Sequence, residues 1–160
     1  LAVAVDDSVP VDRRVDPHHW ADRVRAHGWQ LQLQPSLAQS DGTVLPHTTH
    51  LTITPVTARV LDDLSAALRQ AADEVRGVPG ITAEQVFASL PPELVAGLAD
   101  LAAAGPLDSE TAWAILGQVG IGEDGLPSSL APVLALLTVL PADLTERLLV
   151  ELLARLVEPV

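Results

Sequence analysis

The stretch RAHGWQLQLQ at residues 25–34 changes its periodicity at Gly28, and this change constrains the fold more than any other feature of the sequence. Before Gly28 the apolar residues recur at helical spacing, whereas from Trp29 onward they alternate with glutamine. Asp16 can cap this helix, with Pro17 at its first position, and glycine readily adopts the conformation that ends a helix. The pattern therefore predicts a helix that stops at Gly28 and leads into a strand with one apolar face.

The segments around this boundary have the patterns of a small α+β unit. Residues 1–5 read as a buried strand, and THLTITP at 49–55 alternates as the stretch at 30–34 does. The residues at 35–47 read as a loop with an Asp-Gly turn. An apolar stripe at helical spacing then predicts a helix over 57–76, ended by a glycine. Residues 1–77 are thus expected to form a β-α-β-β-α domain with an antiparallel or mixed sheet and helices on one face.

From residue 78 to residue 160 only helical patterns remain. The helices are expected to begin at Thr82, where Gln85 completes a capping box, at Pro91, at Asp108 or Ser109, near residue 128 and at residue 142. The last helix carries a leucine stripe that must meet another helix: Leu149, Leu152, Leu153 and Leu156. The fold class predicted is therefore α+β, with an all-helical C-terminal extension over 78–160.

The composition excludes several classes of partner. A net charge of −12 would repel a nucleic-acid backbone or an anionic membrane surface, so neither is an expected partner. The longest strongly apolar run, at 130–140, contains a proline and is shorter than the roughly 20 residues that cross a bilayer. The absence of cysteine favours an intracellular protein, and a cytoplasmic location is predicted.

The chain also lacks lysine and tyrosine, which limits the chemistry that it can perform alone. Without lysine it cannot form a Schiff base, and without tyrosine it has no phenolic acid. The sequence opens on LAVAV without an initiating methionine or the layout of a signal peptide. We therefore expect it to be a piece of a longer protein.

Local motifs do not assemble a complete active site. The spacing of the five histidines is poor for one metal ion, so no metal site is predicted and histidines in solvent or at the edge of the core are favoured: His18, His19, His27, His47 and His50. Arg13 and Arg14 precede the first helix and could bind a carboxylate or phosphate of a substrate. Ion pairing with the nearby aspartates is the alternative for both arginines.

The phrases WADRVRAHGWQLQLQP, HLTITPVTARVLDDLSAALRQAADEVRG and TAEQVFASLPPELV resemble the C-terminal domain of pyridoxal-phosphate-dependent group II decarboxylases. Within that fold-type-I superfamily the chain looks most like the sphingosine-1-phosphate lyase branch, and the resemblance covers about residues 1–100. It implies a homodimer in which this small domain closes over a cofactor that a large N-terminal domain holds through its lysine. The chain alone is then expected to bind no cofactor and to be inactive.

The resemblance also suggests individual residues. His50 matches the strand histidine of the family, which is expected to be a structural position. Phe87 falls near the place where the lyase branch has a tyrosine close to the active site, and the missing hydroxyl leaves no proton-transfer role there. With Arg13 and Arg14, these two residues are the candidates for substrate binding, and no catalytic residue is assigned.

Three functions fit the sequence. The chain is interpreted first as the C-terminal part of a lyase or amino-acid decarboxylase, where it supplies pocket walls, domain closure and dimer contacts. The second interpretation is a non-catalytic module that binds a ligand or a protein and uses the helical extension as its partner surface. The third is a degenerate subunit that completes a second, lysine-bearing chain. The sequence upstream of Leu1 would discriminate among them, whereas the substrate and the role of residues 104–160 are not specified.

Overall fold

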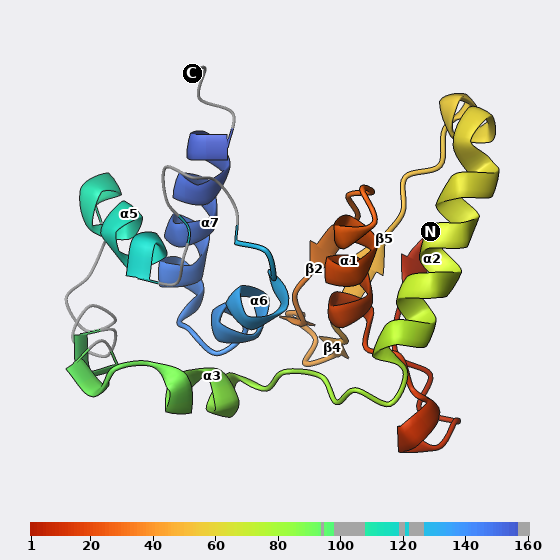
Figure 1. Cartoon of the computed structure of the whole chain (residues 1–160). Coiled ribbons are helices and arrows are strands. Elements are labelled where there is room, and N and C mark those ends of the chain that lie inside the picture. The colour runs from red at the N-terminus through yellow and green to blue at the C-terminus, as the bar shows by residue number, and fades with distance from the viewer. Residues whose placement is uncertain (94, 98–107, 119–120, 122–126, 157–160) are drawn as a thin grey trace. The chain divides into compact units, whose positions relative to one another are not determined.

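The computed structural model describes residues 1–93, 95–97, 108–118, 121 and 127–156 (Figure 1). The chain divides into two compact units. The first, here called the sheet unit, comprises Leu1–Ile81 and Ser128–Leu134; the second, the helical unit, comprises Thr82–Pro127 and Ala135–Val160. Strands are confined to the first unit in the described part of the chain, which confirms the α+β class with a helical extension.

The sheet unit contains a three-stranded sheet in the order β1-β5-β2. Its strands are β1 (Ala2–Val3), β2 (Gln32–Gln34) and β5 (Thr48–His50). Both pairings are antiparallel, with His50 of the central strand opposite Ala2 on one side and opposite Gln32 on the other. The sheet is therefore antiparallel, and β1 and β2 are its edge strands.

Two helices pack together beside this sheet, α1 (Pro17–Ala26) and α2 (Leu61–Val75), as Figure 1 shows. The Asp16 carboxylate caps α1 by accepting hydrogen bonds from the backbone N–H groups of His18 and His19. After α1 the backbone turns at Gly28, which has φ +88°. The predicted start of the first helix and its end at the glycine are thus confirmed.

The core of the sheet unit lies between the two helices and the strands. Its buried members are Trp20, Val24, Leu51, Ala71 and Val75, and half-buried apolar residues such as Trp29 and Leu31 pack against them. The indole N–H of Trp20 on α1 also donates to the Leu68 carbonyl of α2, at 2.9 Å. Burial of each large apolar side chain stabilises the fold by roughly 1.5–3 kcal/mol, so this cluster fixes the helices against each other.

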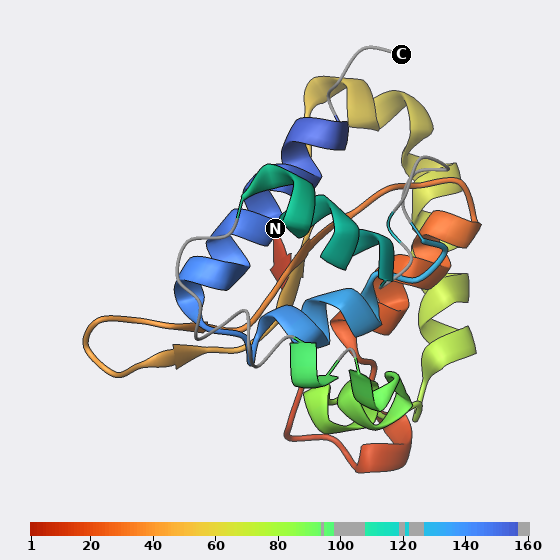
Figure 2. The same cartoon turned by 90° about the vertical axis from the view of Figure 1, so that its left-hand side faces the viewer.

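Three predicted boundaries differ from the structure. The segment 35–47 contains a hairpin of β3 (Leu37–Ala38) and β4 (Val44–Leu45), which projects from the rest of the unit (Figure 2). The strand predicted over 49–55 ends at His50. The long helix begins as the 3₁₀ helix η2 (Pro55–Val60), which has a capping box of Thr54 and Thr57 at its start, and α2 starts only at Leu61.

In the helical unit, the described helices are α3 (Ala83–Ser89), α5 (Ser109–Gln118) and α7 (Ala142–Leu156). The predicted capping box of Thr82 and Gln85 is present at α3. Helix α5 packs against α7, and the two bury Ile115, Leu116, Leu144 and Leu148. Of the predicted leucine stripe, Leu149 is half-buried; the other three side chains and much of the helix expected after Pro91 lie outside the described residues.

Two short helices complete the described elements. The 3₁₀ helix η1 (Val11–Arg13) precedes α1, and α6 (Ala131–Leu137) begins within the sheet unit and ends within the helical unit. Among the described helices, none is sufficiently long and apolar to span a membrane.

Candidate functional site

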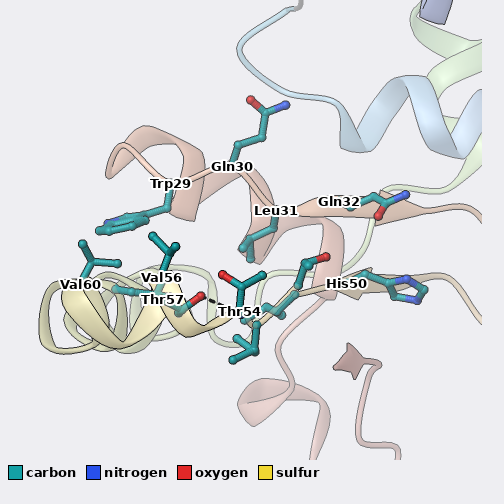
Figure 3. A pocket seen from close by; sticks show the side chains of 13 residues that line it. Trp29, Gln30, Leu31, Gln32, His50, Thr54, Val56, Thr57 and Val60 are labelled. Atoms are coloured by element: carbon teal, nitrogen blue, oxygen red, sulfur yellow. Dashed lines mark hydrogen bonds between the residues drawn. The ribbon is translucent and has the colours of Figure 1, made fainter.

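A groove of about 280 Å³ opens in the sheet unit where β2 and β5 separate. The register that pairs Gln32 with His50 would pair Gln30 with Thr52 at the next hydrogen-bonded rung, but β2 begins at Gln32 and β5 ends at His50. Residues 29–32 and 50–54 therefore diverge and form the two walls of the groove. The first turns of the helix that follows, from Val56 to Leu64, close it from one side (Figure 3).

The lining of the groove is apolar, with neutral polar groups interspersed. Its apolar side chains are Trp29, Leu31, Leu51, Ile53, Val56, Val60 and Leu64. Its polar side chains are Gln30, Gln32, His50, Thr52, Thr54 and Thr57. Trp29 lies over Val56 and Val60, while Gln30 points away from them (Figure 3). With no carboxylate and no arginine in its lining, the groove suits an uncharged or apolar group.

Hydrogen bonds between residues close in sequence fix the position of each wall of the groove. The turn at Gly28 lets the Trp29 backbone N–H donate to the Val24 carbonyl at 3.2 Å, which fixes the indole beside the helix that it follows. On the opposite wall, the backbone N–H of Thr54 donates to the Thr57 hydroxyl at 3.1 Å. The groove is therefore bounded by two chain reversals, each fixed by its own hydrogen bond.

Exposed apolar side chains border this groove along residues 53–61 and are here called the apolar rim. The exposed fractions of Ile53, Val56 and Leu61 are 55%, 64% and 54%, which is high for side chains of this kind. Leu61 follows the lining residue Val60 in the sequence, at the start of α2. Apolar side chains that gather around a concavity are typical of surfaces that another molecule or domain covers.

The groove by itself does not fit pyridoxal phosphate. That cofactor is held as a Schiff base of a lysine, and its phosphate needs several donors. The chain contains no lysine, and His50 is the only lining side chain that can carry a positive charge. In the described residues there is also no group of three metal-ligating side chains. The groove can bind and orient an apolar or amide-bearing group and can exclude water from it.

Of the three predicted site residues in the sheet unit, only His50 lines the groove. His50 lines the groove as part of the central strand and is half-buried. Arg14 instead ties the preceding turn together, because its guanidinium donates to the carbonyls of Val9 and Asp7 and pairs with the Asp7 carboxylate at 3.0 Å. Arg13 is exposed in η1, outside the groove lining, and Phe87 is half-buried on α3 of the helical unit.

A second polar cluster lies at the N-terminus of α1. His47 donates from Nε2 to Asp16 Oδ2 at 2.8 Å, and the ring of His47 contacts that of His18, with 4.7 Å between ring centroids. His18 donates from Nε2 to the Gln34 carbonyl at 2.9 Å. Asp16 and His18 are buried, whereas His47 is half-buried.

This arrangement shifts three pKa values. Burial alone would raise the pKa of Asp16, but hydrogen bonds from His47 and from the His19 backbone outweigh it and lower the pKa to about 2. The hydrogen bond to Asp16 raises the pKa of His47 above its ordinary value of 6.5. Burial lowers the pKa of His18 below 6.5, against the opposing effect of the Gln34 carbonyl. Asp16 and His47 therefore form an ion pair over the pH range in which His47 is protonated.

Sequence reasoning identified Asp16 only as a helix cap and did not assign Trp29 or Val56 to a site. Asp16 and His47 are separated by 31 positions, and no local pattern connects them. The groove residues do carry a signal, because Trp29 follows the helix-ending glycine and Val56 follows a proline that ends an alternating stretch. Both positions mark the end of paired strand structure, where a sheet can open.

Comparison with known proteins identifies the chain at the level of a family. The family model described as "Pyridoxal-dependent enzyme, C-terminal putative HTH domain" matches residues 62–155, which is more than half of the chain. Searches of curated proteins and of solved structures gave no significant match. The match starts in α2 and runs through the helices of the extension, and it confirms the predicted C-terminal domain of a pyridoxal-dependent enzyme. The chain therefore belongs to the family of C-terminal putative HTH domains of pyridoxal-dependent enzymes.

Proposed function

We propose that the chain is the C-terminal part of a pyridoxal-phosphate-dependent carbon-carbon lyase or amino-acid decarboxylase, nearest the sphingosine-1-phosphate lyase branch. In this role it supplies pocket walls, domain closure and dimer contacts, and it performs no catalysis alone. The proposal includes a cytoplasmic homodimer whose large domain holds the cofactor. The observation that carries it is the uncharged groove with its exposed apolar rim, in a chain whose family accompanies a pyridoxal-dependent enzyme.

Three features of the groove support its proposed role as a wall of the substrate pocket. Its apolar residues, Trp29 and Val56 among them, can exclude water from a group placed against them. The neutral Gln and Thr side chains at its mouth can orient that group without adding a charge. The rim around Ile53 is exposed in this chain and would be buried by a larger domain, which would provide the free energy for closure.

The first experiment tests where the cofactor is held. Because the chain has no lysine, mixing residues 1–160 with pyridoxal phosphate should give no internal-aldimine absorption band. The protein encoded by the intact gene, purified in the same way, should give one. An aldimine band from the isolated chain, or its absence from the intact gene product, would contradict the proposal; the second result would favour a non-catalytic module that uses its helices to bind a partner.

The second experiment tests the groove in the whole enzyme. Val56→Asp places a charge on the apolar rim at a side chain that is 64% exposed, so the domain should still fold, but its closed state should be weakened. We expect kcat/KM to fall by about ten-fold or more with the melting temperature unchanged. Val11→Asp is the matched control, since Val11 is also 64% exposed and lies outside the groove. Equal activity of the two variants would show that the groove does not face the reaction.

A further inference from the structure

The groove where β2 and β5 separate exposes backbone groups as well as apolar side chains. Leu1 and Leu51 exchange two backbone hydrogen bonds, both at 2.8 Å, so the backbone of Leu51 faces β1. Successive residues of an extended strand present their N–H and C=O groups to opposite sides, and His50 and Thr52 therefore face β2. His50 is paired there with Gln32, whereas Thr52 lies beyond the end of β5 and faces the groove.

The opposite wall presents a matching set of backbone groups. The register that pairs Gln32 with His50 would bring Gln30 opposite Thr52, but the two strands diverge before this rung. In the described part of the chain, no hydrogen bond uses the backbone N–H or C=O group of Gln30 or of Thr52. Both residues are exposed, so these groups are open to water and available to another strand.

The two faces of the groove differ in polarity. The same register brings Trp29 opposite Ile53 on the face that carries the core, and Gln30 opposite Thr52 on the other face. The lining contains no carboxylate and no arginine that could pair with a charged group. The groove is therefore suited to a strand in which apolar and neutral polar residues alternate.

We propose that the groove receives an extended peptide segment of the large cofactor-binding domain, which adds to the sheet as a further strand beside residues 50–54. The backbone of this segment pairs with the N–H and C=O groups of Thr52, and one of its apolar side chains lies between Trp29 and Ile53. The inference rests on the proposed function, because it names the part of the larger domain that closes on the groove. Since β2 and β5 are antiparallel, the segment is antiparallel to one wall and parallel to the other.

Peptide chemistry fits this groove better than a purely apolar ligand. A strand supplies an N–H and a C=O group to Thr52, which an alkyl or aryl group cannot do. It also covers the exposed side chains of Ile53 and Val56. A segment of the same protein is favoured over a second copy, because the family of this chain accompanies a pyridoxal-dependent enzyme and a covalently linked segment is present at high effective concentration.

Hydrogen exchange of backbone amides, resolved to single residues by mass spectrometry, tests this pairing. The protein encoded by the intact gene is compared with the 160-residue chain. In the intact protein the Thr52 amide should exchange about ten-fold more slowly or less, because it becomes hydrogen-bonded. The Ile53 amide points to the opposite side of the strand and should keep its rate. An added strand thus protects alternate amides, whereas simple covering of the surface protects neighbouring ones alike.

Three outcomes would overturn the inference. Equal exchange of Thr52 in the two proteins excludes the added strand. Equal slowing of Thr52 and Ile53 in the intact protein indicates that a ligand or a domain surface covers the groove without pairing. Slowing in the isolated chain that increases with its concentration assigns the groove to a second copy. The proposed function is judged separately by the aldimine band of the intact protein, so a band together with rapid exchange of Thr52 refutes the strand alone.

Proline substitution in the intact enzyme is a second test. Thr52→Pro removes the N–H group that the added strand needs and breaks no hydrogen bond within the described chain. We expect kcat/KM to fall by about ten-fold, since the closed state loses a backbone hydrogen bond.

Ser40→Pro is the matched control for this substitution. Its N–H group is also unbonded, and Ser40 lies outside the groove in a turn closed by the hydrogen bond from Gly42 to the Gln39 carbonyl, at the position where proline is favoured. Equal kcat/KM values for the two folded variants would contradict the inference. If Thr52→Pro failed to fold, the exchange of the Thr52 amide in the unmodified protein would decide.

Discussion

At the scale of single residues, two glycines show how the same backbone conformation can have different consequences. Gly42 and Gly77 both have positive φ, +86° and +76°. Gly42 occupies the tip of the exposed hairpin, where a Cβ would meet nothing within 4 Å. At Gly77 a Cβ would lie 2.6 Å from the backbone oxygen of Asp12, which cannot move without displacing η1. Gly42 is thus required only by its positive φ. Gly77 is required both by its positive φ and because a side chain there would clash with Asp12.

This difference predicts unequal effects of the same substitution. Gly42→Ala should destabilise the chain by about 1 kcal/mol, which is the cost of a left-handed alanine. Gly77→Ala should cost about 2–4 kcal/mol because the steric clash with Asp12 adds to that strain. Urea unfolding of both variants and the wild type measures the two values. Equal free energies of unfolding for the two variants would mean that η1 moves away from the added methyl group without an energetic cost.

At the scale of elements, the sequence predicted those that a local signal encodes. The helix from Pro17 to the Gly28 turn and the capping box at Thr82 were readable because cap, period and stop residue lie within a few positions of each other. The end of β5 at His50 could not be read from the sequence. The alternation of apolar and polar residues continues to Thr54, but the partner strand β2 has already diverged from β5 at His50. Strand pairing is set by a distant segment, so the groove that this divergence opens could not be predicted from the sequence.

A contact between α1 and the start of α6 illustrates the same limit. The buried Asp22 carboxylate accepts hydrogen bonds from the Ser129 hydroxyl at 2.6 Å and from the backbone N–H groups of Leu130 and Ala131. More than 100 residues separate the partners. This carboxylate therefore holds the returning segment 128–131 within the sheet unit.

Removal of this carboxylate should release that segment. Asp22→Ala leaves the backbone N–H groups of Leu130 and Ala131, at the start of α6, without this acceptor, and we expect a loss of about 2–3 kcal/mol in the free energy of unfolding. Ser129→Ala removes one hydrogen bond and should cost about 1 kcal/mol. Asp62→Ala, at an exposed site in the first turn of α2, is the control and should change stability by less than about 1 kcal/mol. If Asp22→Ala matched this control, the contact would not hold the segment.

At the scale of the whole molecule, charge is distributed very unequally. The helical unit has eleven acidic residues against two arginines, a net charge of −9, whereas the sheet unit has ten against seven, a net charge of −3. The family description names an HTH domain, and proteins that use a helix-turn-helix on DNA approach the phosphate backbone with basic side chains. The family name thus denotes a fold that other proteins use to bind DNA, whereas the negative charge of this chain disfavours binding to DNA.

We predict that the chain does not bind duplex DNA, because repulsion between its negative charge and the phosphate backbone should outweigh the contacts that the fold allows. Basic DNA-binding proteins bind even non-specific DNA with Kd values of roughly 10⁻⁴–10⁻⁶ M, through release of counterions that an acidic surface cannot displace. Electrophoretic mobility or fluorescence anisotropy at low salt should show no binding up to about 100 μM chain. A variant with the exposed Glu84, Glu93 and Glu110 changed to lysine raises the charge of the helical unit from −9 to −3 and tests whether repulsion is the cause. Binding by the wild-type chain that weakens with added salt would contradict the prediction and would make the helical unit a nucleic-acid-binding domain despite its charge.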